Sequence, residues 1–476
     1  MAIVTEPQAA VNKLNPYLQG NFAPINYETT AYALNVTGEI PVDLAGRLLR
    51  IGPNPTQRLD AERAHWFTGL GMVHGVRLSD GRAQWYRSRY VRAGAAARQL
   101  GLELAPGPAG NDGSVNTTIV PMGAGTYACV EAGAFPVELS YELDSRSRSD
   151  LGGGLKRGFA AHAKMDPHTG ELVALAYQPG SPRVQHVVVD VDGVARQISE
   201  IELPHMPLIH DVAITQTSVV ILDLPVTFVP AAVRAGNFPY SWNDNQISRV
   251  GLLPRDGDVS KLQWFEAPRC FVFHCLNAYD DANTVVLDVC RHPKMFASGE
   301  PDIAEGTPVL ARWILNRELG TLSETIVDEH GSEFPRLNGA FESQQYRYGY
   351  TASAADGGNL GPTLKHDFKT GTTALHTYGH GRVASEPVFV ARASATDEDD
   401  GWLMSYVYDV DRDASDIVIL AANDFSGPPV ATIELPCACR SAFMGIGLRT
   451  RCRKRRNGCL VTKKHVPERS ETRAEK

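Results

Sequence analysis

Three histidines in this 476-residue chain have the type and spacing needed to bind one metal ion. His162, His210 and His274 are separated by 48 and 64 residues, and each lies in or beside a short apolar run typical of a β-strand. Imidazoles delivered from separate strands can bind iron, copper, nickel or zinc. The alternative is three unrelated histidines, each hydrogen-bonded at the end of its own strand. Spacing alone leaves both interpretations open.

The segments that position these histidines indicate an all-β architecture. Residues 203–225 contain a loop with several prolines, then His210, then two apolar runs, Val212–Ile214 and Val219–Leu222, with a polar turn at Thr215–Ser218. Propeller blades of four short strands recur about every 40–50 residues, which is close to the spacing of the histidines. Gly and Pro recur throughout the chain, and long stretches with helical periodicity are scarce. We therefore expect one all-β body whose blades bring the histidines to a common axis.

Composition excludes several classes of protein. No apolar run approaches the ~20 residues of a membrane-spanning helix, and the N-terminus lacks the basic and apolar segments of a secretion signal. The scattered cysteines of the body are typical of a reducing compartment, so we expect a cytoplasmic protein. The whole chain has a net charge of −8, although its last forty residues hold 12 Lys and Arg against 3 Asp and Glu. The body is therefore acidic, which argues against nucleic acid as a partner.

Six motifs occur in an order that resembles the carotenoid cleavage oxygenases, a group that includes stilbene-cleaving dioxygenases and the vertebrate retinoid isomerase. The motifs are RIGPNP, HWFTGLGMVHGVRL, AHAKMDPHTGEL, IHDVAITQTSVVILDLP, FVFHCLNAYDD and SEPVFVARASATDEDDGWLMSYVYD. The resemblance extends over residues 15–436. It implies an all-β, seven-bladed β-propeller in which loops and short helices cap an axial metal site. We expect residues 1–436 to form this single domain.

The resemblance also implies a reaction and a set of site residues. Members of the family bind a non-haem Fe(II) with four histidines and use O₂ to cleave a conjugated C=C bond into two carbonyl products. Glutamates behind the metal hold the ligand rings. The positions that match three of the ligands and three of these glutamates are His162, His210, His274, Glu131, Glu333 and Glu386.

The chemistry of such a centre explains the glutamates. Neutral imidazoles leave the charge of Fe(II) uncompensated, and their far-side N–H groups need acceptors. Carboxylates there fix the orientation and tautomer of each ring and raise its basicity. Glu131 lies between apolar residues, which favours burial with a partner, whereas the alternative for each glutamate is an ordinary surface carboxylate. We expect Glu131 and Glu333 to accept hydrogen bonds from the histidines, whose ring nitrogens should lie within roughly 5 Å of one another.

The fourth histidine ligand is missing from its expected place. In the family it follows a strand that matches Ala431–Pro436, in a pattern close to R-V-P-x-G-F-H-G-x-W, whereas this chain reads CACRSAFMGIGLRTRCRKRR. Back-translation of Cys437–Gly447 with a shift of two bases permits Arg-Val-Pro-Phe-Gly-Phe-His-Gly-Asn-Trp. We therefore interpret residues 437–476 as an aberrant basic tail that is out of frame, through a mutation or a sequencing error. The alternative is an evolved basic tail that binds anionic lipid.

An out-of-frame tail predicts particular structural features. Strand pairing should fade within a few residues of Pro436, and residues 449–476 should pack poorly. No histidine should occupy the fourth corner of the metal site, where residues 443–446 or solvent should be nearest. Glu386 should lack the histidine partner that its family role requires. With three ligands in place of four, the chain should bind its metal more weakly and be impaired as an enzyme.

Two segments bear on the substrate. Stilbene-cleaving members of the family carry a Lys that meets the substrate hydroxyl, in a strand that matches Thr126–Ala132, and this chain has Val130 there. An apolar residue favours a lipophilic carotenoid or apocarotenoid polyene over a phenolic stilbene. The apolar, aromatic segment Val226–Trp242 is either a tunnel mouth in peripheral contact with a membrane or a packed propeller loop. Two other classes remain: a non-catalytic or defective propeller that binds an apolar ligand, and a Ca²⁺-dependent hydrolase, which the imidazoles disfavour.

Overall fold

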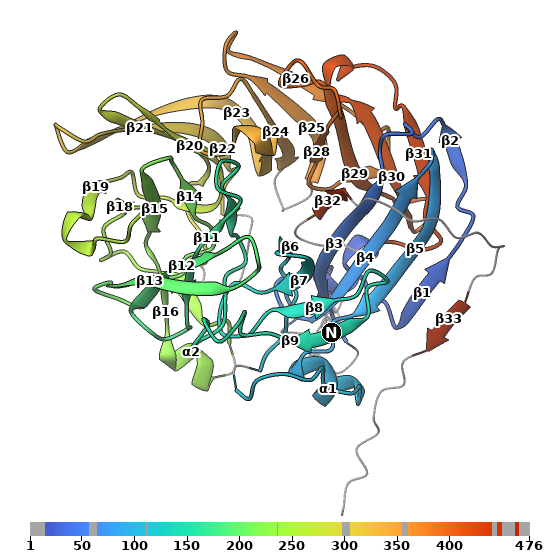
Figure 1. Cartoon of the computed structure of the whole chain (residues 1–476), viewed down its shortest axis with the longest axis horizontal. Helices are drawn as coiled ribbons and strands as arrows, with labels where there is room; N and C mark the ends of the chain where they lie inside the picture. The colour runs from blue at the N-terminus through green and yellow to red at the C-terminus, as the bar shows by residue number, and fades with distance from the viewer. Residues whose placement is uncertain are drawn as a thin grey trace, which may run out of the picture.

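The computed structural model describes residues 15–56, 64–110, 112–235, 237–297, 305–354 and 360–439, together with the backbone of two later strands at 445–449 and 462–465. Short antiparallel strands dominate this part of the chain and form seven blades that follow one another around a ring (Figure 1). The predicted all-β, seven-bladed propeller is confirmed. Its two α-helices are short, α1 (Gly94–Leu100) and α2 (Pro230–Arg234). Across the described ranges, no helix combines the length and apolarity needed to cross a bilayer.

Blades 1 to 4 are separate sheets, and strands at one end of each sheet, such as β6 (Thr118–Met122) and β32 (Gly445–Arg449), lie toward the middle of the ring (Figure 1). In sheet order, blade 1 contains β32 (Gly445–Arg449), β3 (Gly46–Asn54), β4 (Leu70–Ser79), β5 (Arg82–Tyr90), β1 (Tyr27–Ala31) and β33 (Thr462–His465). Blade 2 contains β6 (Thr118–Met122), β7 (Gly125–Cys129), β8 (Val137–Leu139) and β9 (Ser145–Arg148). Blade 3 contains β10 (Lys164–Met165), β11 (Leu172–Tyr177), β12 (Arg183–Val189) and β13 (Ala195–Glu202), and blade 4 contains β14 (Ala213–Ile214), β15 (Ser218–Asp223), β18 (Arg249–Pro254) and β19 (Gln263–Glu266).

The hairpin at the start of blade 4 forms where the sequence predicted it. Ala213 pairs with Val220 and Ile214 with Val219, so the two apolar runs lie side by side. The turn between them closes because Thr215 Oγ1 accepts a hydrogen bond from the Ser218 amide at 2.9 Å. A second hairpin, β16 (Val226–Phe228) and β17 (Tyr240–Trp242), follows and carries α2 between its strands.

Blades 5 and 6 are joined by one long strand. β23 (Thr321–Leu337) pairs with β22 (Val309–Asn316) in blade 5 through its first part and with β24 (Tyr348–Ala354) in blade 6 through its second part. Its pairing register shifts between Glu333 and Arg336, where the strand passes from one blade to the next. The remaining strands of these blades are β20 (Phe271–Asp281), β21 (Thr284–His292), β22 (Val309–Asn316), β24 (Tyr348–Ala354), β25 (Leu360–Asp367) and β26 (Thr372–His376).

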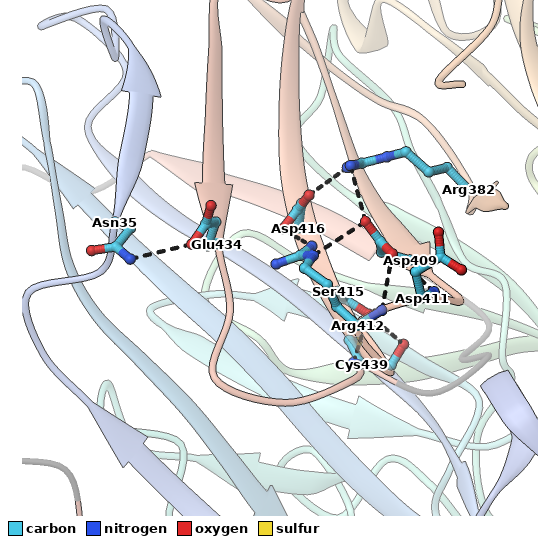
Figure 2. Close-up of polar contacts among 9 residues, drawn as sticks. All are labelled: Asn35, Arg382, Asp409, Asp411, Arg412, Ser415, Asp416, Glu434 and Cys439. Atoms are coloured by element: carbon cyan, nitrogen blue, oxygen red, sulfur yellow. Dashed lines mark hydrogen bonds and ion pairs between the residues drawn. The ribbon is translucent and has the colours of Figure 1, made fainter. Parts of the chain in front are cut away.

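Blade 7 is completed by the N-terminal part of the chain. Its outermost strand is β2 (Val36–Gly38), which pairs with β31 (Ala431–Glu434), and Asn35 Nδ2 donates a hydrogen bond to Glu434 Oε2 at 3.2 Å (Figure 2). Around the turn between β29 (Gly401–Asp409) and β30 (Ala414–Ala421), Arg382 and Arg412 form ion pairs with Asp409 and Asp416 (Figure 2). The other strands are β27 (Arg382–Ala384), β28 (Val388–Ala391), β29 (Gly401–Asp409) and β30 (Ala414–Ala421).

The packing core lies between neighbouring blades. One apolar cluster joins blades 3 and 4 through residues such as Leu175 and Ile221. Another joins blades 1 and 7, and it includes Val76, Trp402 and Cys437. Each blade therefore buries both faces of its sheet against its neighbours, as burial of apolar surface requires in a ring of small sheets.

The C-terminal segment differs from the sequence-based expectation. Cys437 and Cys439 are buried, and the Cys439 amide donates a hydrogen bond to Ser415 Oγ at 2.9 Å (Figure 2). Strand pairing does not fade after Pro436, because β32 pairs with β3 and β33 pairs with β1. The physical reason is that a strand edge offers backbone N–H and C=O groups to any extended segment, whatever its side chains.

Two further expectations about the tail cannot be compared with the fold. The residues predicted to lie nearest the fourth corner, 443–446, fall mostly outside the described residues, and so does most of the range 449–476 that was predicted to pack poorly. The backbone of β32 nevertheless takes the first place in the order of blade 1, which is the place that β10 and β14 take in blades 3 and 4.

Candidate metal centre

Three blades supply the three histidines from equivalent places. His162 lies just before β10, and His210 lies just before β14. His274 lies within β20. These strands stand first in the order of blades 3, 4 and 5. Because the first strands meet around the axis of the ring, histidines far apart in the sequence come together in space.

The ring nitrogens of the three histidines converge. His162 Nε2 lies 3.0 Å from His210 Nε2, and one nitrogen from each of the three rings lies within 4.8 Å of the others. Two nitrogens bound at about 2 Å to one ion, at a right angle, are about 3 Å apart, so the His162–His210 pair fits a shared metal. The spacing satisfies the limit of roughly 5 Å set from the sequence. The three imidazoles therefore form a set of nitrogen donors that suits a divalent transition metal.

Glu131 holds the ring of His210 from behind. Its Oε2 lies 2.7 Å from His210 Nδ1, as expected, and its other oxygen accepts a hydrogen bond from the hydroxyl of Tyr177. Burial and the nearby Glu131 charge both raise the pKa of Tyr177, so this hydroxyl keeps its proton and remains a donor. A carboxylate that accepts from Nδ1 leaves the Nε2 lone pair of His210 directed toward the other two histidines.

Glu333 holds the ring of His274 in the same way. Its Oε2 lies 2.5 Å from His274 Nδ1 and also accepts the amide N–H of Phe334 at 2.6 Å. Its Oε1 lies 2.7 Å from Nε2 of a fourth histidine, His292. Phe334 has a φ of +52°, in the left-handed region, at the point where β23 changes register. Backbone strain of this kind is found at functional sites where the surroundings fix one conformation.

The charges around the centre favour different protonation states for its histidines. Burial, followed by the neighbouring His210 and His274, lowers the pKa of His162 well below its usual range. Burial also opposes protonation of His210, but Glu131 outweighs it and raises the pKa of that ring. Burial opposes ionisation of Glu333, yet the adjacent His274 and His292 lower its pKa. Glu333 is therefore an anionic acceptor, and His162 is ready to bind metal as a neutral ring.

Glu386 has a different partner. Its Oε1 accepts a hydrogen bond from Arg336 Nε at 2.7 Å, and its side chain is almost fully buried. Arg336 lies on β23, three residues after Glu333. The guanidinium neutralises a carboxylate that, in the predicted arrangement, would face the ring of the fourth histidine.

A lysine and an aspartate connect the three blades that carry the converging histidines, and neither was assigned a role from the sequence. Asp211 Oδ2 accepts hydrogen bonds from the Cys275 amide at 2.8 Å and from Lys164 Nζ at 3.1 Å. Lys164 Nζ also donates to the Cys275 carbonyl at 3.3 Å. Each of these residues is one or two positions from one of the three converging histidines, which is the signal that could have found them. Their contacts connect the three segments that carry these histidines.

His292 is another residue that the sequence reasoning missed. It is the last residue of β21, and its only sequence signal is a histidine at the end of an apolar strand followed by Pro293. The fold brings it to Glu333 across blade 5. Sequence spacing could not predict this contact, because it depends on the register between β20, β21 and β23.

An apolar cavity of about 350 Å³ opens beside the histidines. His210 and His274 line it, and so does Val130, the residue that was compared with the stilbene-enzyme Lys. Its wall also includes Phe238 and Tyr240 from the segment Val226–Trp242, so this segment contributes to the cavity. Among the other wall residues are Trp66, Phe67, Phe273, Phe296, Phe334 and Leu360. The volume is at the small end of the roughly 300–1,000 Å³ typical of ligand sites.

Known proteins resemble this chain over most of its length. The retinal pigment epithelial membrane protein family matches residues 22–446. A carotenoid cleavage oxygenase of Mycobacterium tuberculosis is 36% identical, over 93% of this chain and 99% of that protein. An isoeugenol monooxygenase of Pseudomonas nitroreducens is 28% identical, over 92% of this chain and 98% of that protein.

Solved structures agree with these matches. Cobalt-substituted apocarotenoid oxygenase from Synechocystis aligns with a TM-score of 0.79 and 25% identity, over 89% of this chain and 96% of that chain. Lignostilbene dioxygenase from Pseudomonas brassicacearum has the same fold, with a TM-score of 0.83, 24% identity and coverage of 93% and 99%. With a family match over most of the sequence and a relative more than 30% identical along nearly its whole length, the chain belongs to the carotenoid cleavage oxygenase family.

Proposed function

We propose that this protein is a non-haem iron(II) dioxygenase that cleaves a conjugated C=C bond of a carotenoid or apocarotenoid. Both atoms of O₂ enter the products, so one C=C bond and one O₂ molecule give two C=O groups. The observation that carries the proposal is the convergence of His162, His210 and His274, the last two of which line an apolar cavity. A relative named as a carotenoid cleavage oxygenase supports the choice of substrate.

The ligand role of the three histidines rests on their hydrogen bonds. Glu131 accepts from Nδ1 of His210 and Glu333 accepts from Nδ1 of His274, which leaves the Nε2 lone pairs for a metal. Imidazole nitrogens suit iron, and a bound Fe(II) would supply the site for activating O₂. Carboxylates behind the rings raise ligand basicity and offset the charge of the ion.

The chain's own residues would bind, orient and shield the substrate. Aromatic side chains such as Phe67, Phe273 and Phe334 form the cavity wall and pack against a conjugated chain. Their apolar surface excludes water from the region beside the histidines. Val130 contributes apolar surface and no charge, which supports a polyene substrate.

We propose that the tail from Cys437 to Lys476 is translated out of frame. The shifted reading frame would encode a fourth histidine in this segment. The place of β32 beside β3 supports it, because β32 stands first in its sheet, as do the strands next to His162 and His210. The chain as given would then bind iron with three histidines and be impaired in activity.

Stilbene cleavage within the same family is a second candidate function. It is favoured by the isoeugenol monooxygenase relative, whose named substrate is a phenol with a conjugated side chain. A non-catalytic propeller that binds an apolar ligand is the outcome expected if no metal is bound.

We further propose a cytoplasmic protein in peripheral contact with membranes, where lipophilic substrates dissolve. The segment between β16 and β17 supports this, since it exposes Pro230, Ala231 and Val233 while Phe238 and Tyr240 line the cavity. The acidic body supports the absence of nucleic acid as a partner.

The test is to purify the protein anaerobically, measure its iron content, and incubate it with an apocarotenal under ¹⁸O₂. A dioxygenase should give two carbonyl products that both carry the label. A His210→Ala variant should bind less iron and form neither product. Label in one product only would indicate a monooxygenase, and no bound metal in either protein would favour the non-catalytic propeller.

A further inference from the structure

Tyr177 connects the metal centre to the apolar packing between blades. It is the last residue of β11 in blade 3, and its side chain belongs to the apolar cluster that joins blades 3 and 4. The residue is 2% exposed. Its hydroxyl donates a hydrogen bond to Oε1 of Glu131, whose Oε2 lies 2.7 Å from His210 Nδ1. One chain of hydrogen bonds therefore passes from blade 3, through a carboxylate that follows blade 2, to a histidine at the start of blade 4.

The two carboxylates behind the converging histidines are held by different numbers of donors. Glu333 lies within β23 and accepts three hydrogen bonds, from two histidine rings and one backbone amide. Glu131 lies two residues after the end of β7, and in the described part of the chain its side chain is hydrogen-bonded to His210 and Tyr177. The side chain of Glu131 is 22% exposed, against 7% for Glu333. Apart from the ring that it orients, Glu131 therefore depends on Tyr177 for its position.

Two partners fix both oxygens of Glu131, and with them the plane of its carboxylate. With His210 as its single partner, this carboxylate could turn about its side-chain bonds and carry its charge into the apolar cavity, which it lines. A hydrogen bond to an ionised acceptor is stronger than one between neutral groups, so the hydroxyl holds Glu131 firmly. Burial, and next the charge of Glu131, raise the pKa of Tyr177, which keeps the proton on this hydroxyl.

We propose that Tyr177 is a positioning residue of the metal centre. Its hydroxyl holds Glu131 in the orientation in which this carboxylate accepts from His210 and directs the Nε2 lone pair of that ring toward the metal. The inference rests on the proposed function, because it assigns Tyr177 a role toward the metal ion. Groups that hydrogen-bond a ligand from behind contribute to metal affinity. Tyr177 acts one hydrogen bond farther out, so its contribution is smaller than that of Glu131.

A second buried tyrosine provides a matched control. Tyr177→Phe removes the hydroxyl and leaves the ring in its apolar cluster. Tyr346 is 6% exposed, and its hydroxyl donates to Asp288 Oδ2 at 2.6 Å. This carboxylate also accepts from Arg312 and is thus paired with a guanidinium. Tyr346→Phe therefore removes an equivalent buried hydrogen bond from a carboxylate that holds no histidine of the centre.

The measurement is a Co²⁺ titration of the folded proteins, made in the parent chain and in a Glu131→Ala background. We expect Tyr177→Phe to lower Co²⁺ affinity about three- to ten-fold in the parent, below the 10–100-fold typical of groups that contact a ligand. In Glu131→Ala the same change should lower it by less than about two-fold, because no carboxylate remains to be held. The visible spectrum of bound Co²⁺ reports its coordination geometry and should change in Tyr177→Phe but not in Tyr346→Phe.

A merely structural role would lower the melting temperatures of both tyrosine variants and leave Co²⁺ affinity and spectrum unchanged. Equal affinities of the parent and Tyr177→Phe would overturn the proposal, and so would an equal loss in both backgrounds or in Tyr346→Phe. Failure of Tyr177→Phe to fold where Tyr346→Phe folds would assign the hydroxyl to blade stability and likewise overturn it. Absence of Co²⁺ binding in the parent would contradict the proposed function as well, whereas tight binding without these differences refutes this inference alone.

Discussion

Two buried carboxylates of the centre, Glu333 and Glu386, have the same expected role but different partners. Glu333 contacts two imidazoles, at 2.5 Å from His274 and 2.7 Å from His292. Glu386 accepts from the guanidinium of Arg336 at 2.7 Å. The difference teaches that one fold can neutralise a buried carboxylate with imidazoles in one place and with a guanidinium in another.

The largest expected effect is a loss of metal affinity on removal of one of the three converging histidines. We expect His274→Ala to lower metal affinity by more than about 100-fold, because ligand loss exceeds the 10–100-fold effect typical of the residues behind ligands. Iron content and a Co²⁺ titration would measure the change, with His168→Ala at an exposed site as the control. Unchanged iron content in His274→Ala would show that this histidine does not bind the metal.

The next largest effect is expected on iron occupancy and cleavage rate when the reading frame after Pro436 is restored. The restored chain would carry a histidine and a tryptophan after β31, and its iron occupancy and polyene-cleaving rate should rise roughly ten-fold or more. Metal analysis of the two chains, purified side by side, measures this directly. If the original chain already binds iron fully and cleaves polyene at the same rate, the fourth ligand is dispensable.

The two carboxylates should respond unequally to the same substitution. Glu333→Gln should lower metal affinity by about 10–100-fold in the original chain, because His274 loses an anionic acceptor. Glu386→Gln should change it by less than about three-fold there, and by about ten-fold or more in the frame-restored chain. Co²⁺ titrations of the four proteins test the contrast. Equal effects of both substitutions in the original chain would contradict it.

The smallest expected effect concerns a third carboxylate, Glu342, close to Lys164. Burial is the largest cause that raises the pKa of Glu342 to about 7, and Asp211 adds to it. The folded state thus keeps a proton that the unfolded state loses near pH 4.5, so stability falls as pH rises from 4.5 to 7. The shift corresponds to about 3 kcal/mol, which Glu342→Gln should remove. Melting temperatures at pH 5 and pH 8 should differ less in the variant than in the parent, and identical pH profiles would exclude Glu342 as the cause.

The elements that could be predicted from the sequence are those whose local residue pattern matches their place in the fold. The apolar runs around Thr215 predicted β14 and β15, and the histidine motifs predicted three rings that do converge. It failed at contacts set by strand register, such as His292 with Glu333 and Arg336 with Glu386. It also failed after Pro436, because side-chain patterns cannot exclude a strand that forms through backbone pairing alone.

The single strand shared by blades 5 and 6 limits how this protein can change in length. β23 carries Glu333 and Arg336 on either side of its register shift. Glu333 contacts His274, and Arg336 donates a hydrogen bond to Glu386, so this one strand contributes to the contacts of both buried carboxylates. Because side chains alternate along a strand, inserting or deleting one residue between these two would turn one of them to the opposite face. Hairpin tips elsewhere in the ring can gain or lose residues at the surface. In β23 a change of one residue would separate Glu333 from its histidines or Glu386 from its arginine.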